Sequence, residues 1–156
     1  MAGFRPYGDI KKVVHFKAAS AVYPGDLVEL LATGDVQAID ATSDLVLGVA
    51  LAYAKAGEEV PVSVDPDQLY AVETDGAGTA PVAADVGAGR DPVIGTPDTT
   101  YKQSGMKLDA DGSVNDTFIL IDKLDEPKND WGQSPMKVLV KINKHQFFGK
   151  DAATEI

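Results

Sequence analysis

The chain has 156 residues, of which 44% are hydrophobic and 24% charged, and its formal net charge is −10. This composition excludes a disordered chain, and the length fits one globular domain. The absence of cysteine excludes disulfide scaffolds, thiolate metal sites and cysteine nucleophiles. With 15 glycines and 9 prolines, the chain is rich in turn formers, which favours a β protein.

Eight segments have the alternating or continuous apolar character of β-strands. In chain order they are residues 12–17, 27–32, 36–40, 45–52, 59–64, 68–74, 117–122 and 137–143. The turn at Thr33-Gly34-Asp35 predicts that the second and third segments form a hairpin. The alanine-rich residues 50–59 are interrupted by glycine, which favours a strand end and a turn over a helix. The pattern predicts an all-β fold, a small β-barrel or β-sandwich.

Three further segments complete the predicted organisation. We expect residues 1–11 to form an extended N-terminal arm, residues 12–150 a single β domain and residues 151–156 a C-terminal tail. Residues 76–105 are rich in Gly, Ala, Pro, Asp and Thr and have no sustained apolar pattern, so they predict a long loop. A loop of this length inside a compact domain is usually functional or ordered by a partner.

The candidate chemical motifs lack residues that their chemistry needs. The Gly-x-Gly pairs that begin at Gly76 and Gly87 have proline where a phosphate loop has its third glycine. Residues 109–113 lack the glycine and glutamate that complete a calcium loop, so they predict an ordinary β-turn. Ser104 lies outside any strand-to-helix elbow. We therefore expect no enzyme, no cofactor and no metal site.

Membranes and nucleic acids are also unexpected as partners. The longest nearly apolar run, residues 45–54, is too short to span a membrane. Arg5 and Pro6 stand where an export signal has its apolar region, so we expect synthesis in a cytoplasm. Trp131 and the tyrosines are scattered, and acidic charge opposes nucleic-acid binding.

The charge is segregated along the chain. Residues 1–20 hold four cations and one acid, residues 21–122 four cations and 18 acids, and residues 123–150 six cations and three acids. One interpretation is a solvated acidic surface that keeps molecules apart. The other is that both basic ends meet an acidic partner while the acidic middle faces solvent.

Several short stretches carry a resemblance to a known family. They are Gly3–Gly8 (GFRPYG), Tyr23–Val28 (YPGDLV), Val46–Ala50 (VLGVA), Ala56–Glu58 (AGE), Asp65–Gly76 (DPDQLYAVETDG) and Lys137–Phe147 (KVLVKINKHQF). In this order they resemble the head decoration, or cement, proteins of tailed bacteriophages. Residues 79–96 have no counterpart in the resemblance.

The resemblance implies a virion structural protein on the outer surface of a phage capsid. Such a protein would be a homotrimer, made in the host cytoplasm, that stabilises the head by binding across assembled subunits of the major capsid protein. We expect its docking residues to be apolar and basic side chains of the N-terminal arm: Phe4, Arg5, Pro6, Tyr7, Lys11 and Lys12. We expect its subunit interface to include the closing residues Asn143, His145, Gln146 and Phe147.

Each of these assignments has an alternative. A terminal segment is often frayed and solvated, and the closing residues could serve only core and strand-end packing. The whole protein could instead be a carbohydrate- or host-surface-binding β module. A third alternative is a small β-fold hydrolase that uses Asp, Ser and His145.

Overall fold

The computed structural model describes residues 2–43 and 45–147, and these form an all-β fold, as the sequence predicts. The described residues contain one short 3₁₀ helix, η1 (Ala83–Asp85), and no α-helix. The predicted C-terminal tail, residues 151–156, and the last residues of the predicted domain lie outside the described residues. The strands are β1 (Arg5–Pro6), β2 (Val13–Lys17), β3 (Leu27–Leu30), β4 (Val36–Ala38), β5 (Gly48–Ala50), β6 (Glu59–Ser63), β7 (Leu69–Glu73), β8 (Gly89–Arg90), β9 (Pro92–Val93), β10 (Lys107–Leu108), β11 (Phe118–Lys123) and β12 (Lys137–Ile142).

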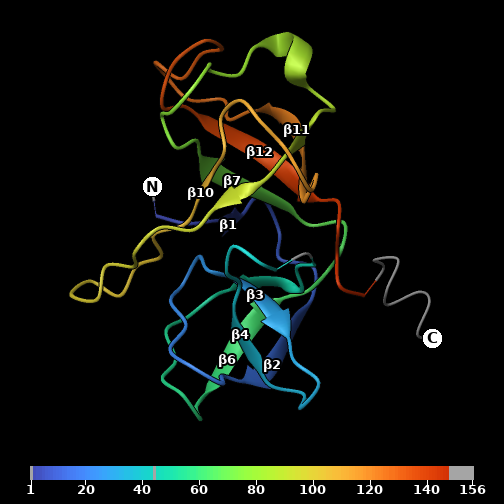
Figure 1. Cartoon of the computed structure of the whole chain (residues 1–156), viewed down its shortest axis with the longest axis vertical. Helices are drawn as coiled ribbons and strands as arrows, with labels where there is room; N and C mark the ends of the chain where they lie inside the picture. Colours follow the sequence, from blue (N-terminus) through green and yellow to red (C-terminus); the bar gives the residue numbers. More distant parts are fainter. Residues whose placement is uncertain (1, 44, 148–156) are drawn as a thin grey trace.

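Two five-stranded antiparallel sheets build the molecule (Figure 1). The first sheet has the order β1-β7-β12-β11-β8 and the second the order β2-β6-β5-β3-β4, while β9 and β10 pair as a separate two-stranded ladder. The long strands β7, β11 and β12 form the centre of the first sheet. In Figure 1 the first sheet occupies the upper half and the second sheet the lower half.

The second sheet curls until its two edge strands approach each other. Ala18, directly after β2, forms a bridge with Val36 of β4, and the Ala19 N–H donates to the Val36 carbonyl at 2.8 Å. The curl encloses an apolar cluster that consists mainly of small and branched side chains: Ala18, Val22, Val28, Val36, Leu47, Ala50, Ala54, Val60, Val62 and Val64. Burial of these side chains is what keeps the small sheet curved.

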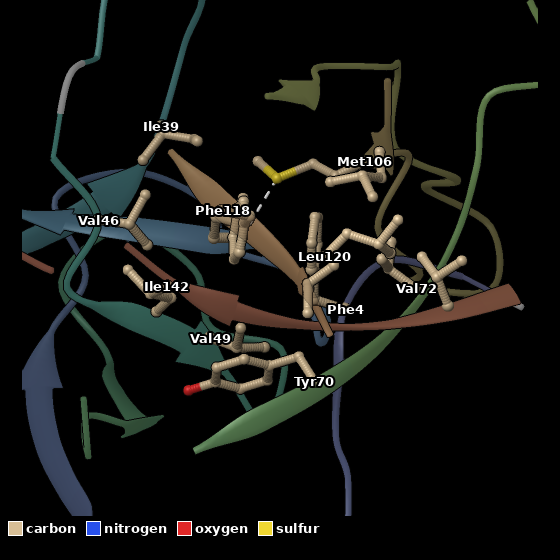
Figure 2. Close-up of a cluster of buried hydrophobic side chains, with 14 of the residues drawn as sticks. Phe4, Ile39, Val46, Val49, Tyr70, Val72, Met106, Phe118, Leu120 and Ile142 are labelled. Atoms are coloured by element: carbon tan, nitrogen blue, oxygen red, sulfur yellow. Dashed lines mark hydrogen bonds between the residues drawn. The ribbon is translucent and has the colours of Figure 1, made fainter. Parts of the chain in front are cut away.

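The main core draws side chains from both sheets (Figure 2). Tyr70 and Val72 of the first sheet and Leu27 and Val49 of the second belong to it. The Tyr70 hydroxyl also lies 3.1 Å from the Ser63 hydroxyl, so a hydrogen bond joins the sheets, and burial raises the pKa of Tyr70 to about 12. Because both sheets bury one face in this cluster, each needs the other to stay packed.

All eight predicted strand segments overlap an observed strand. The hairpin predicted around Thr33-Gly34-Asp35 is confirmed as the β3–β4 pair, and residues 50–59 hold a strand end and turns instead of a helix. The sequence did not predict β1, β8, β9 or β10, each of two residues. The predicted loop of residues 76–105 contains η1, β8 and β9, so it is more ordered than its composition suggests.

Gly48 shows why one motif residue has to be glycine. A Cβ atom at this position in β5 would lie 1.8 Å from the Ser63 carbonyl oxygen of β6. Backbone atoms cannot yield to that overlap, so only glycine allows β5 and β6 to pair here.

Candidate functional site

The predicted N-terminal arm is extended, and residues 4–7 of it are fixed to the body. β1 pairs antiparallel with the outer edge of β7. On either side of this pair, the Phe4 N–H donates to the Gly25 carbonyl at 2.9 Å and the Tyr7 N–H to the Leu69 carbonyl at 2.8 Å. The segment thus contacts both sheets, because Leu69 begins β7 and Gly25 precedes β3.

Phe4 is the one predicted docking residue that lies inside the protein. Its side chain is 1% exposed, and its ring stacks on that of Phe118 with 4.9 Å between centroids and 15° between planes (Figure 2). To fill a pocket in a partner, Phe4 would have to leave this core and forfeit its own burial. Phe4 is therefore a core residue of this structure, and its docking into a capsid protein stays a prediction.

The other five predicted docking residues lie at the surface. Tyr7 is 47% exposed, and the remaining four are exposed or, for the proline, half-buried: Arg5, Pro6, Lys11 and Lys12. Their accessibility leaves them available to a partner.

The basic residues near the N-terminus differ from most other cations of the molecule. Arg5, Lys11, Lys12 and Lys17 form no ion pair with any described residue. By contrast, five cations elsewhere each pair with a carboxylate of this chain: Arg90, Lys107, Lys123, Lys137 and Lys141. These four basic side chains can therefore pair with acidic residues of another molecule without first breaking an ion pair with a described residue of this chain.

A hairpin of residues 95–105, here called the finger, projects from the body (Figure 1, yellow). Two backbone hydrogen bonds between Asp98 and Gln103, of 2.9 and 3.1 Å, close it. At its base the two arms run so close that a Cβ atom on Gly105 would lie 2.2 Å from the Thr96 carbonyl oxygen. The base is thus a tight crossing that glycine alone permits.

The tip of the finger presents an aromatic side chain to solvent. The Asp98 carboxylate accepts the N–H groups of Thr100 and Tyr101 at 2.9 and 3.1 Å, which orders the tip. Tyr101 is 76% exposed. The ammonium group of the next residue, Lys102, lies 4.9 Å from the ring centroid of Tyr53, which follows β5, and this cation–π contact fixes the finger against the second sheet. A large aromatic group kept so exposed on an ordered turn is a suitable anchor for a partner.

A hollow of about 310 Å³, here called the finger hollow, lies between the finger and the N-terminal segment. Its lining includes Arg5 and Pro6 of the N-terminal segment and Tyr101 and Lys102 of the finger. Two cations and an aromatic ring therefore face one space, an arrangement that suits an acidic segment of a protein surface.

A buried carboxyl group connects the base of the finger to the turn before β3. The Asp26 carboxylate accepts the Tyr23 N–H at 3.0 Å and bonds the hydroxyl of Ser104, a finger residue. Burial raises the pKa of Asp26, and these hydrogen bonds partly oppose the increase. The Pro24-Gly25-Asp26 motif thus positions the finger as well as making a turn.

The predicted interface residues divide into buried and exposed groups. His145 is 2% exposed, and the Gln146 amide bonds both the N–H and the carbonyl of Leu30, each at 2.7 Å. Asn143 is exposed and Phe147 is 41% exposed. The half-buried Gln146 thus satisfies a strand end of its own chain, and Asn143 and Phe147 are the exposed members of the predicted interface.

A second hollow, of about 460 Å³, lies beside these closing residues. Asn143 and His145 line it together with Ile119 and an ion pair in which Lys141 approaches Asp67 to 3.0 Å. The bond to Lys141 is the main cause of the lowered pKa of Asp67. This hollow brings two of the four predicted interface residues together, and the finger hollow holds none of them.

Sequence reasoning missed the two finger residues Tyr101 and Lys102. The sequence feature that could have indicated them is a single tyrosine followed by a lysine in the polar run Asp98–Gln103, which lies in a segment without an apolar pattern. A tyrosine without apolar neighbours in sequence has no strand face to join, which favours an exposed position.

Other classes of site were sought in the described part of the chain. Residues 2–43 and 45–147 contain no cluster of three or more potential metal-ligating side chains. Within the same ranges, no helix has the length and apolar character needed to cross a membrane.

Comparison with known proteins does not place the chain in a family. No protein-family model matches the sequence, and no curated protein matches it.

Proposed function

We propose that this protein decorates and stabilises the outer surface of a tailed-bacteriophage head by binding across assembled major capsid protein subunits. The single observation that carries the proposal is the finger hollow, which an ordered, exposed Tyr101 lines together with Arg5 and Lys102. The sequence motifs resemble those of head decoration proteins in the same order, and this resemblance is the reason for proposing the major capsid protein as the partner.

The finger hollow suits adhesion to a protein lattice. Aromatic and arginine side chains dominate the energetics of most protein interfaces, and Tyr101 and Arg5 provide one of each. The unpaired cations Lys11 and Lys12 add attraction to acidic capsid groups. Many copies then act together, because each occupied site stabilises the assembled lattice by mass action, and a trimer would add avidity.

Co-sedimentation with phage heads tests this function. The protein is mixed with mature and with immature heads that lack it, prepared from the phage that encodes it, at low and physiological salt. We expect saturable binding that weakens as salt rises, because cations contribute to it. The substitution Tyr101→Ala should weaken binding by about tenfold or more, as for an interface anchor.

The matched control is Val86→Ala, which truncates another exposed apolar side chain, 48% exposed, beside η1. It should bind like the unsubstituted protein. Binding to neither kind of head at any salt would contradict the proposed function. Equal binding by Tyr101→Ala and Val86→Ala would contradict the assignment of the finger hollow.

Light scattering tests the proposed homotrimer. A trimer has three times the 16.4 kDa mass of the chain. A mass of one chain at micromolar concentration would contradict a preformed trimer and leave the single copy as the binding unit.

A further inference from the structure

We propose that the outer edge of β2 is a second binding site, which takes an extended acidic segment of a partner polypeptide as an added strand. This site is separate from the finger hollow and does not depend on the proposed function. It is built from β2 and the lysines around it.

The hydrogen-bond pattern shows which backbone groups of β2 point outward. In an antiparallel ladder, the N–H and C=O of one residue point to the same side, and successive residues alternate. The Pro61 carbonyl accepts the Leu51 N–H at 2.9 Å, so Pro61 turns its backbone away from β2. His15 is opposite Pro61, so the N–H and carbonyl of His15 face outward. The same alternation turns Val13 and Lys17 outward.

The inward groups of β2 are occupied as this pattern requires. Val14 and Phe16 are opposite Val62 and Val60 of β6, and the Val64 N–H donates to the Lys12 carbonyl at 3.1 Å. The outward groups of Val13 and His15 lie outside the β2–β6 ladder, and β4 reaches the edge only at Lys17, where the Ala18–Val36 bridge places Val36 beside the Lys17 carbonyl. The edge is thus a ready template for strand addition.

The side chains along this edge are accessible. Val13 is 38% exposed, and His15 and Lys17 are exposed as well. Ile10, 47% exposed, extends the apolar surface toward the N-terminus. An added strand would therefore find both free hydrogen-bonding groups and apolar side chains to cover.

The positive charge around β2 determines which kind of strand can bind at its edge. Lys11, Lys12 and Lys17 flank the edge and form no ion pair with described residues. A second copy of β2, paired antiparallel around His15, would bring Lys17 of one chain against Val13 of the other, next to Lys12. Such crowding of like charges disfavours self-pairing, which is how edge lysines protect many sheets. The same lysines favour an acidic strand.

A synthetic ten-residue peptide that alternates glutamate and valine tests the site. A peptide with lysine in place of glutamate is the control. We expect the acidic peptide alone to bind in fluorescence anisotropy. Amide hydrogen exchange should then slow at Val13, His15 and Lys17 of the unsubstituted protein. No binding at millimolar peptide, or protection confined to another edge, would overturn the proposal.

Two substitutions at one position test the strand geometry. His15→Pro removes an N–H that points away from β6 and takes no part in the β2–β6 ladder, a position where edge strands tolerate proline. We expect at least tenfold weaker peptide binding. His15→Val keeps the N–H and should bind normally. Equal binding by both variants would overturn the proposal, and the exchange measurement decides the question if His15→Pro fails to fold.

Two charge variants test the selectivity. Lys12→Gln with Lys17→Gln should weaken binding by about three- to tenfold, since exposed ion pairs contribute little each. Lys55→Gln with Lys128→Gln removes the same charge elsewhere and should have no effect. If both double substitutions weakened peptide binding equally, the assignment of the binding site to β2 would be overturned. Tyr101→Ala should leave peptide binding unchanged, so failure here is distinguishable from failure of the proposed function.

Discussion

Phe4 illustrates how the surroundings of one side chain decide its role. It follows Gly3 and precedes Arg5, so no neighbouring apolar residue marks it as part of a core. Its ring nevertheless stacks on Phe118 and is almost fully buried, because the N–H of Phe4 is fixed to the Gly25 carbonyl. A residue that the sequence places on a docking arm thus stabilises the fold.

The first prediction concerns this residue. Phe4→Ala should lower the free energy of unfolding by about 3–5 kcal/mol, because it removes a buried ring and leaves a cavity. Tyr7→Ala, three positions along and half-exposed, should change it by about 0.5 kcal/mol or less. Urea unfolding followed by circular dichroism measures both. A loss at Phe4 no larger than that at Tyr7 would show that the segment does not pack into the core.

At the scale of elements, the predictable strands are those whose own residues alternate or form a continuous apolar run. The five residues of β2 alternate between exposed and half-buried, and β11 and β12, of six residues each, contain apolar runs that are visible in the sequence. β1, β8, β9 and β10 have two residues each, so no period can show. Their partners lie far away in sequence, and tertiary packing alone creates them. The finger was unpredictable for the same reason, since its base depends on the contact of Gly105 with Thr96.

The second prediction concerns the segment after β12. Val46 forms a parallel bridge with His145, and the Gln146 amide continues the pairing by bonding both backbone groups of Leu30. Gln146→Ala should lower the free energy of unfolding by about 1–2 kcal/mol, because two part-buried hydrogen bonds are lost. Asn143→Ala, which removes one exposed bond to the Asp116 carbonyl, should cost less. Thermal unfolding measures both, and equal effects would contradict the role of Gln146.

At the scale of the whole molecule, the distribution of charge along the sequence differs from the distribution of unpaired charge in the folded protein. The basic segment at residues 123–150 uses Lys123, Lys137 and Lys141 in ion pairs with the chain's own acids. The basic residues before position 18 form no such pair with the acids of residues 2–43 and 45–147. The count along the sequence could show that both ends are basic, but not which end is neutralised, because that depends on acids brought near by folding.

The last prediction concerns acid sensitivity. Burial lowers the pKa of His145 below its usual 6.5, although the nearby Val64 carbonyl and the Asp65 carboxylate partly oppose this. The unfolded chain therefore takes up a proton at a higher pH than the folded protein does. As the pH falls below 6.5, stability must decline, by at most about 1.4 kcal/mol per pH unit, until the folded pKa is passed.

Urea unfolding between pH 7.5 and 5.5 measures this decline. His145→Gln removes the titrating group, so its free energy of unfolding should vary less with pH than that of the unsubstituted protein, even if its absolute stability is lower. His15→Gln replaces the other, exposed histidine and should retain the steeper dependence. The buried carboxyl of Asp26, whose pKa is raised, acts in the opposite direction, because the folded protein takes up that proton first as the pH falls. Since Asp26 is present in all three proteins, its effect cancels in their differences. Parallel curves for His145→Gln and His15→Gln would contradict the assignment of the acid sensitivity to His145.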